Sequence, residues 1–355
     1  MKKFKVTLTG GGTAGHVMPH LALLPYMREQ SWDIQYIGSS GIEKKLIAEA
    51  GLPFSCIRSG KLRRYFSIQN IFDVFNVLIG LVQSLVILIK RRPDVVFSKG
   101  GYVTVPVVVA SWFLRIPVVA HESDYTPGLA TKIAAFFAGR ILYTFPETEK
   151  YLVKNRSKWV GTPIRKELGQ GNEAKGLEFL GFDSDEKYPV VLVMGGSQGA
   201  QKINQLVVAA LPHLTKYLRI VHLTGKGKKS ELHVPGYVAF EYLGNQLADV
   251  LAATDYVVAR AGANSIFEFL FLNKPMLLIP LEEGNRGDQV LNAKSFESKG
   301  WARIFRETAA KPEWLISAID HLLKDSDAIV KSQIESRPDM NPQQIIEVLL
   351  EESKV

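Results

Sequence analysis

The sequence contains almost no cysteine. Cys56 is the sole cysteine in 355 residues, so neither a network of internal disulfides nor a cysteine-based zinc site can form within the chain. The first residues also lack the apolar core of a signal peptide, because Lys5 interrupts the run and glycines follow closely. We therefore expect a protein that stays in the reducing cytoplasm.

The chain also lacks the composition of a disordered protein. Hydrophobic residues make up 46% of it and charged residues 22%, which is typical of globular proteins, and its length allows two domains. The net charge of +8 is uneven, since residues 1–161 carry 21 Lys and Arg against 10 Asp and Glu, and the remainder 22 against 25. The basic first half suggests an anionic partner, such as a membrane surface or a nucleic acid, with a plain solvated surface as the alternative.

One long apolar run, residues 71–92, raises the question of a membrane span. Its first nineteen residues would form a helix of roughly 28 Å, close to the thickness of a bilayer core. However, Asp73, Asn76 and Gln83 interrupt the run, and a strand-like segment follows at 94–98. These features favour a buried crossover helix with one exposed apolar stripe.

The segment before this run mixes cations with aromatic rings: Lys61, Arg63, Arg64, Tyr65 and Phe66. Beside an apolar helix, such a mixture is typical of a surface that binds the membrane interface. No RNA- or DNA-binding module is recognisable. We therefore expect the Lys61–Arg64 region and the neighbouring helix to contact an anionic membrane surface, and we expect no nucleic-acid partner.

Short β-branched runs recur, each followed by glycine or a turn and then a helical pattern. They lie at residues 4–8, 34–37, 94–98, 117–120 and 140–144, and again at 190–194, 219–224, 239–242, 256–259 and 276–279. This alternation predicts two Rossmann-like, doubly wound α/β domains. We expect domains at 1–161 and 162–340, and a C-terminal helical segment, 341–355, that packs back on the first domain.

Glycine-rich turns follow several of these strands: LTGGGTAG and SKGGY in the first domain, and VMGGSQGA and RAGANS in the second. In open α/β sheets ligands bind beyond the carboxyl ends of the strands, so we expect the loops of both domains to face a central cleft. A dinucleotide site is excluded at the first turn because the second strand ends in Gly38-Ser39-Ser40 without a carboxylate. A Walker-type loop is excluded because no Gly-Lys-Ser/Thr follows.

What remains is a tight turn at a helix N-terminus, which favours anionic or oxygen-rich ligands. His16 comes directly after this turn in the sequence. Its imidazole titrates near neutral pH, so it is a candidate base, although a residue that merely satisfies the backbone at the helix start would look the same.

At this point the residues resemble a known family. Seven motifs occur in order between about residues 4 and 295: GGGTAGH, SKGGYVTVPVVVAS, HESDYTPGL, GTPIR, MGGSQGA, RAGANSIFE and GDQVLNA. Together they resemble the MurG family of bacterial N-acetylglucosaminyltransferases. The resemblance implies a GT-B glycosyltransferase fold, peripheral attachment to the cytoplasmic face of the membrane, and inverting transfer of N-acetylglucosamine from UDP to a lipid-linked muramyl pentapeptide (lipid I), giving lipid II in peptidoglycan synthesis.

The resemblance also implies donor-binding residues. Arg165 and Ser197 match positions that contact the donor, and their charge and hydroxyl suit a pyrophosphate, although Arg165 could instead form an interdomain salt bridge. Glu268 matches the residue that binds the ribose diol, although Ser265-x-x-Glu268 also fits a capping box in which Ser265 caps the helix. The remaining positions are Leu243 and Ala263 for uracil, Gln289 for the N-acetylglucosamine, and Asn264 and Ser265 beside them.

On the acceptor side, Thr13, Ala14 and Gly15 match the family's glycine-rich turn, and His16 is the candidate catalytic base. Ala14 stands in place of a glycine, which is tolerable at negative φ. The chain also departs from the common His-Glu-Gln-Asn motif at His121-Glu122-Ser123-Asp124. An ionised Asp124 can only accept hydrogen bonds, so its contact with the donor sugar should differ.

No metal or cofactor is expected. Asp-x-Asp patterns occur at 183–185 and 325–327, but both lie in polar surface sequence away from the strand-end loops. Three other functions remain open: a related GT-B diacylglycerol glycosyltransferase, a catalytically silent sugar-nucleotide-binding protein, and a nicotinamide-dependent oxidoreductase.

Overall fold

The computed structural model of the protein describes residues 3–60, 68–183, 188–196, 199–228, 230–283, 287–309 and 311–354. The chain divides into two compact units. Unit 1 comprises Met1–Ile164 and Asp339–Val355, and unit 2 comprises Arg165–Pro338.

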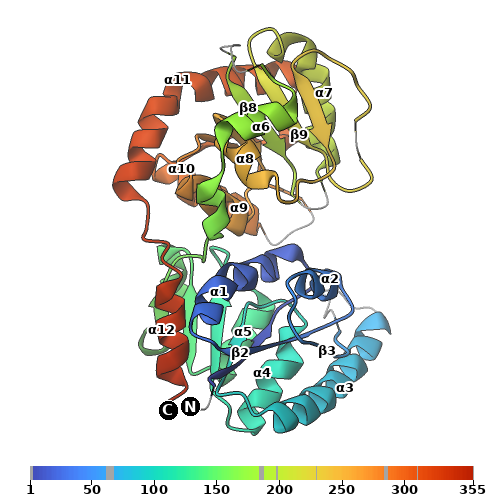
Figure 1. Ribbon diagram of the computed structural model, residues 1–355, viewed down its shortest axis with the longest axis vertical. Coiled ribbons are helices and arrows are strands. Elements are labelled where there is room, and N and C mark those ends of the chain that lie inside the picture. Colours follow the sequence, from blue (N-terminus) through green and yellow to red (C-terminus); the bar gives the residue numbers. More distant parts are fainter. Residues whose placement is uncertain are drawn as a thin grey trace. The chain divides into compact units, whose positions relative to one another are not determined.

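Within the described residues, unit 1 contains a seven-stranded parallel sheet in the order β3-β2-β1-β4-β5-β6-β7, coloured blue to green in Figure 1. Its strands are β1 (Lys5–Thr9), β2 (Asp33–Gly38), β3 (Phe54–Cys56), β4 (Val95–Ser98), β5 (Val118–Glu122), β6 (Arg140–Tyr143) and β7 (Ser157–Trp159). Because β1 pairs with both β2 and β4, the strand order reverses there. Ligands bind at such a switch point in doubly wound sheets.

Helices cover both faces of this sheet. They are α1 (Met18–Glu29), α2 (Ile42–Glu49), α3 (Ile68–Arg91), α4 (Thr104–Phe113), α5 (Leu129–Phe137) and α12 (Gln343–Glu352), with short 3-10 turns η1 (Ala14–His16), η2 (Pro146–Tyr151) and η3 (Lys154–Arg156). One core joins α1 and α12 to the sheet, as at Leu23, Phe97 and Leu349. The other joins α3, α4 and α5 to it, as at Val96 and Val107. The alternation of Val96 and Phe97 between the two cores is the period of a strand buried on both faces.

Unit 2 repeats this design. Its described residues form a six-stranded parallel sheet in the order β10-β9-β8-β11-β12-β13. The strands are β8 (Val190–Met194), β9 (Arg219–Leu223), β10 (Tyr237–Phe240), β11 (Tyr256–Ala259), β12 (Met276–Leu278) and β13 (Arg303–Ile304). The helices are η4 (Lys166–Gln170), α6 (Glu173–Leu180), α7 (Gln201–Leu214), α8 (Leu247–Ala252), α9 (Ala263–Phe271), α10 (Asp288–Ser298), η5 (Glu307–Ala309) and α11 (Pro312–Ser336). Buried residues such as Val193, Ile203 and Ile319 form its core between the sheet, α7 and α11.

The expected fold class, two parallel α/β sheets, is confirmed. Three strands were not predicted: β3, β7 and β13, each of two or three residues at a sheet edge. Edge strands are short and only partly buried, so they leave no apolar run to detect. The strand predicted at 239–242 begins two residues earlier, at Tyr237, because the left-handed Gly236 (φ 79°) already completes the turn before it.

Candidate active site

The first glycine-rich turn of unit 1 is held by close backbone packing. A Cβ on Gly10 would lie 2.4 Å from the carbonyl oxygen of His16, and one on Gly101 would lie 2.3 Å from that of Gly11. Gly12 has a φ of 84° and faces the ring of Tyr102. The loops after β1 and β4 therefore touch each other at positions where only glycine fits.

His16 lies at the end of η1 with a defined orientation. Its Nδ1 is 3.0 Å from the carbonyl oxygen of Gly11 and 3.1 Å from Oγ1 of Thr13. A carbonyl oxygen only accepts, so Nδ1 carries the proton and Nε2 carries the lone pair. Ala14 is not among the left-handed residues, so its methyl group introduces no backbone strain.

A buried carboxylate that the sequence analysis missed supports this turn. Glu43, at the start of α2, is fully buried. Its Oε2 accepts the backbone N–H of Gly12 at 3.3 Å, and its Oε1 accepts that of Ser39 at 3.0 Å. The loops after β1 and β2 are thus joined through one side chain.

A second buried pair lies beneath the turn. Tyr36 donates its hydroxyl proton to the carbonyl of Gly10 at 2.9 Å and accepts from Nδ1 of His20 at 3.3 Å. Burial, and then the nearby charges of Lys99 and His16, hold the pKa of His20 well below its ordinary value. His20 is therefore a neutral part of the core at physiological pH.

At the end of β5, the motif His121-Glu122-Ser123-Asp124 forms a tight turn. Glu122 accepts the backbone N–H groups of Asp124 and Gly128, each at 2.9 Å. Lys99, which follows β4, donates to Nδ1 of His121 at 2.6 Å and to Oγ of Ser123 at 2.7 Å. The sequence analysis also missed Lys99. A lysine directly after a buried strand and before two glycines could have marked it as a candidate site residue.

In unit 2, Arg165 and Glu268 meet. Nε of Arg165 lies 3.0 Å from Oε1 of Glu268, and both side chains are mostly buried. The pair lies within unit 2, so it is not the interdomain salt bridge that remained open for Arg165.

The capping box that remained an alternative at Ser265 and Glu268 is excluded. Helix α9 already begins at Ala263, and Gly262 is its N-cap, where no side chain among the described residues caps the helix. Ser265 is therefore the third residue of the helix, and its hydroxyl does not cap it.

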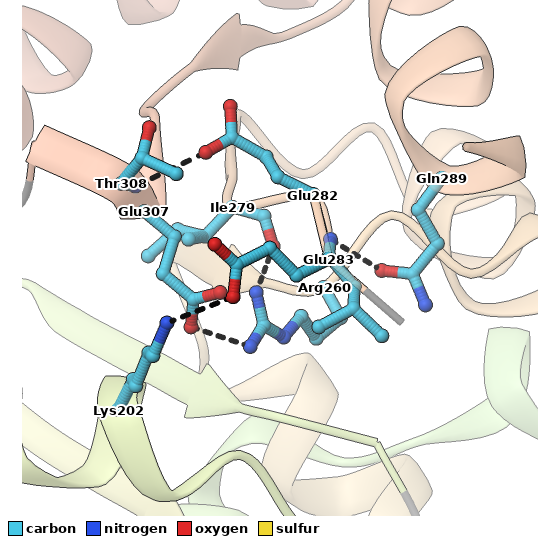
Figure 2. A network of polar contacts seen from close by, with 9 residues as sticks. Lys202, Arg260, Ile279, Glu282, Glu283, Gln289, Glu307 and Thr308 are labelled. Carbon is cyan, nitrogen blue, oxygen red and sulfur yellow. Dashed lines mark hydrogen bonds and ion pairs between the residues drawn. The ribbon is translucent and has the colours of Figure 1, made fainter. Parts of the chain in front are cut away.

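The other predicted donor residues follow strands of the same sheet, on a loop or at the start of a helix. Leu243 follows β10, Ala263 and Asn264 begin α9, and Gln289 is the second residue of α10. Oε1 of Gln289 accepts the backbone N–H of Leu281 at 3.0 Å, which fixes the amide (Figure 2). Ser197 lies outside the described residues.

A buried ion pair anchors the loop after β11. Arg260 donates to Glu307 at 2.6 Å and to the carbonyl of Ile279 at 3.1 Å, as Figure 2 shows. Asn292 donates to the carbonyl of Ala261 at 3.1 Å. The loop that leads into α9 is therefore held from three elements, a long-range arrangement that the sequence did not reveal.

The described residues contain no group of three His, Cys, Asp or Glu side chains that could hold a metal. In the pattern at 325–327, Asp325 forms an exposed ion pair with Arg303. Of the pattern at 183–185, Asp183 alone belongs to the described residues.

Helix α3 presents apolar side chains to solvent. By length and composition its segment Asp73–Arg91 is sufficient to cross a membrane, and only 17% of that segment is buried. The helix does connect β3 to β4 as a crossover, but the expectation that it is buried is wrong, because most of its residues are partly or fully exposed. Its exposed large residues are Val74, Phe75, Leu78, Ile79, Val82, Val86 and Ile89. Trp112 and Phe113 at the end of α4, and Phe136 near the end of α5, are also exposed. We call these ten residues the apolar surface; the basic residues predicted beside it, Lys61–Arg64, lie outside the described residues.

Both halves of the chain match one family. Residues 6–143 match the glycosyltransferase family 28 N-terminal domain, and residues 190–345 match the glycosyltransferase family 28 C-terminal domain. The chain belongs to glycosyltransferase family 28.

Relatives within family 28 carry a more specific name. The chain is 51% identical to a UDP-N-acetylglucosamine–N-acetylmuramyl-(pentapeptide) pyrophosphoryl-undecaprenol N-acetylglucosamine transferase 2 of Bacillus cereus, over 91% of this chain and 92% of the relative. It is 46% identical to the transferase of Clostridium perfringens with the same name but no number, over 98% of both chains. Membership of the family named MurG is therefore shown, and the protein is a UDP-N-acetylglucosamine-dependent glycosyltransferase.

Solved structures agree on the fold. MurG of Acinetobacter baumannii has a TM-score of 0.74 at 21% identity, covering 99% of this chain and all of its own. The glycosyltransferase of kitacinnamycin has a TM-score of 0.77 at 17% identity, with the same coverage. The two parallel sheets of this protein therefore belong to the GT-B glycosyltransferase fold.

Proposed function

We propose that this family 28 protein transfers N-acetylglucosamine from UDP to lipid I, forming lipid II with inversion at the anomeric carbon. The observation that carries the proposal is the 51% identity to a transferase so named, which extends over 91% of this chain. A diacylglycerol acceptor, the alternative acceptor, has no such support.

The acceptor half of the chemistry belongs to the turn after β1. A hydroxyl oxygen of the muramyl sugar forms a bond to C1 of the donor sugar, while the bond from C1 to the UDP oxygen breaks. The hydroxyl proton moves to Nε2 of His16, whose lone pair follows from the Nδ1 contact with Gly11. Thr13, Ala14 and Gly15 shape the turn that receives the acceptor.

The donor half belongs to unit 2. Negative charge develops on the departing UDP, and Arg165, the hydroxyl of Ser197 and the positive end of the α9 helix dipole are the groups that stabilise it. Glu268 accepts hydrogen bonds from the ribose diol, and its ion pair with Arg165 fixes its orientation. Leu243 and Ala263 contact uracil, and Asn264, Ser265 and Gln289 line the remaining donor site.

No metal is required in this proposal, because Arg165 and backbone N–H groups supply the positive potential. Transfer should therefore persist in excess EDTA. A loss of transfer in EDTA that Mg²⁺ restores would contradict this part.

The apolar surface gives the protein access to a lipid-linked acceptor. Exposed patches of this kind mark membrane or protein contact sites, and the surrounding unit carries a net +11 up to residue 161. We propose peripheral binding to the anionic cytoplasmic face of the membrane. Sedimentation with anionic liposomes should weaken at high salt, whereas salt-independent binding to neutral liposomes would argue against the electrostatic part.

The deciding experiment measures UDP release from UDP-N-acetylglucosamine with a short-chain lipid I analogue, with diacylglycerol, or without acceptor. Release that depends on the lipid I analogue, with a disaccharide product of inverted configuration by NMR, is the expected result. Release with diacylglycerol alone would move the function to glycolipid synthesis. No release with either acceptor would contradict the proposal.

A further inference from the structure

The peptide group between Gly11 and Gly12 has a partner at each end. Its N–H donates to Oε2 of Glu43 at 3.3 Å, and its carbonyl oxygen lies 3.0 Å from Nδ1 of His16. A trans peptide is planar, and its N–H and C=O point in opposite directions. One rigid group therefore links the carboxylate of Glu43 to the imidazole of His16.

The orientation of this peptide needs a restraint, because both of its residues are glycines. Glycine adopts positive and negative φ with similar ease, so a peptide between two glycines can flip at little steric cost. Gly12 has a φ of 84°. A flip would direct the carbonyl oxygen of Gly11 at the carboxylate of Glu43, and two acceptors repel each other. The carboxylate therefore favours the orientation in which the carbonyl faces His16.

Glu43 is itself held in place. Its side chain is fully buried, and its Oε1 accepts both the backbone N–H of Ser39, at 3.0 Å, and the hydroxyl of Ser39. A Cβ on any of three glycines would lie 2.5–3.0 Å from an atom of this side chain: Gly11, Gly38 and Gly41. Buried carboxylates need such partners. The contacts with Ser39 are local to the start of α2, whereas the contact with the turn after β1 is not explained by local structure.

We propose that Glu43 is a positioning residue for His16 that acts through the peptide between Gly11 and Gly12. The carboxylate fixes the peptide, and the carbonyl at its other end keeps the imidazole proton on Nδ1 and the lone pair on Nε2. Hydrogen bonds in such a chain polarise one another, so the charge of Glu43 strengthens the carbonyl as an acceptor. The inference rests on the proposed function, in which Nε2 of His16 takes the proton of the acceptor hydroxyl.

The tautomer of His16 tests the structural half without any substrate. In protein labelled with 15N-histidine, the His16 signals are assigned by their loss in His16→Ala. At about pH 9, where histidine is neutral, the 15N shifts report which nitrogen carries the proton. We expect Nδ1 to carry it in the wild type, and Glu43→Gln to shift the population towards the Nε2–H form that histidine favours in water.

The physical reason is that a glutamine has one acceptor oxygen for two backbone N–H groups and carries no charge. The Nε2–H tautomer in the wild type, or equal tautomer populations in the wild type and in Glu43→Gln, would overturn the inference.

A split between turnover and donor affinity tests the functional half. With the lipid I analogue, Glu43→Gln should lower kcat about tenfold to a hundredfold, the effect of one hydrogen bond to a charged group. Its affinity for UDP should stay that of the wild type, because Glu43 belongs to unit 1 and the proposed uridine contacts belong to unit 2.

A double-mutant cycle with His16→Ala separates positioning from a general loss of structure. In the absence of His16, Glu43→Gln should lower kcat no further, because the base through which it acts is gone. Equal losses from Glu43→Gln with and without His16 would show a merely structural carboxylate and overturn the inference.

Glu352→Gln is the matched control. Glu352 is a buried carboxylate of unit 1 that pairs with Arg140 at 2.9 Å. Arg140 begins β6, so this pair lies at the amino ends of the parallel strands, away from the turn of His16. The tautomer of His16 and kcat should match the wild type in this variant.

If Glu43→Gln does not fold, Ser39→Ala decides the question, because it removes one donor that holds the carboxylate. We then expect a smaller change in the same direction, and an unchanged tautomer with an unchanged kcat would overturn the inference. If the wild type transfers to neither acceptor, the proposed function fails, while the tautomer measurements still decide the link between Glu43 and His16.

Discussion

Arg165 and Glu268 form an ion pair between residues 103 positions apart in the sequence, with Nε and Oε1 separated by 3.0 Å. Arg165 immediately precedes η4, and Glu268 lies in the second turn of α9. The guanidinium therefore restrains the carboxylate from one side, which leaves its other oxygen for a ligand.

Replacing Glu268 by Gln should weaken UDP binding. The amide preserves the shape but removes the charge of the ion pair and one acceptor of the ribose hydroxyls, so we expect a loss of about tenfold to a hundredfold in affinity. Isothermal titration calorimetry with UDP measures it. Asp325→Asn, which breaks the exposed pair with Arg303, is the matched control and should bind UDP normally. Equal affinities for both variants would refute the role of Glu268.

Replacing His16 by Ala should lower kcat while leaving UDP binding intact. Removal of a general base costs about 10² to 10⁴ in rate, and His16 belongs to unit 1, whereas the proposed uridine contacts belong to unit 2. Transfer assays with the lipid I analogue, quenched at set times, give kcat, and calorimetry gives the affinity for UDP. A wild-type kcat in His16→Ala would exclude it as the base.

The buried Lys99 should make the free energy of unfolding depend on pH. Its pKa is lowered to about 7 from the ordinary 10.5, so between these values the unfolded chain binds more protons than the folded one. The free energy of unfolding contributed by this group therefore rises with pH through that window. Lys99→Met lacks this contribution, and its stability relative to the wild type should be highest below pH 7 and fall towards pH 10.5.

Urea unfolding at several pH values measures this difference. Lys274→Met provides a second, partly buried lysine for comparison. A difference between Lys99→Met and the wild type that does not vary with pH would show that Lys99 keeps its ordinary pKa.

Replacing exposed residues of the apolar surface by charged residues should weaken binding of the protein to liposomes. Phe75 and Val82 are each 60% exposed on α3, and replacing both by Asp removes two side chains worth about 1.5–3 kcal/mol each when buried. We expect liposome partitioning to fall at least about tenfold. Ile334→Asp, at a residue that is 58% exposed on α11 of unit 2, is the control and should partition normally.

Breaking the buried pair of Arg260 and Glu307 should destabilise unit 2. Their side chains are 11% and 4% exposed, and removing one partner of a buried pair costs about 3–5 kcal/mol because the other charge stays buried. Glu307→Gln should therefore lower the unfolding midpoint markedly, as calorimetry would show. A shift no larger than that of Asp325→Asn would contradict this account.

The sequence was sufficient for the parts of the fold that rest on local pattern. Buried strands such as β8 and β11 have uninterrupted apolar runs, and their bounds were predicted correctly. The edge strands β7 and β13 lack such runs. The capping-box alternative at Ser265 failed because α9 begins three residues earlier than that pattern would require.

The site was less accessible to prediction. His16 and Glu268 could be selected because each lies in a short motif, and their roles came from family resemblance. Glu43, Lys99 and Arg260 act through contacts with residues far along the chain, and no local spacing indicates which backbone group or side chain they will meet.

The interruption of unit 1 by unit 2 has a consequence for protein engineering. Unit 1 resumes at Asp339, and a Cβ on Gly161 would lie 3.5 Å from the carbonyl oxygen of Asp339. The segment Arg165–Pro338 is therefore an insertion whose two junctions are neighbours in the host. Such a segment can be exchanged as one cassette for the corresponding part of a relative, with both stretches of unit 1 left unchanged.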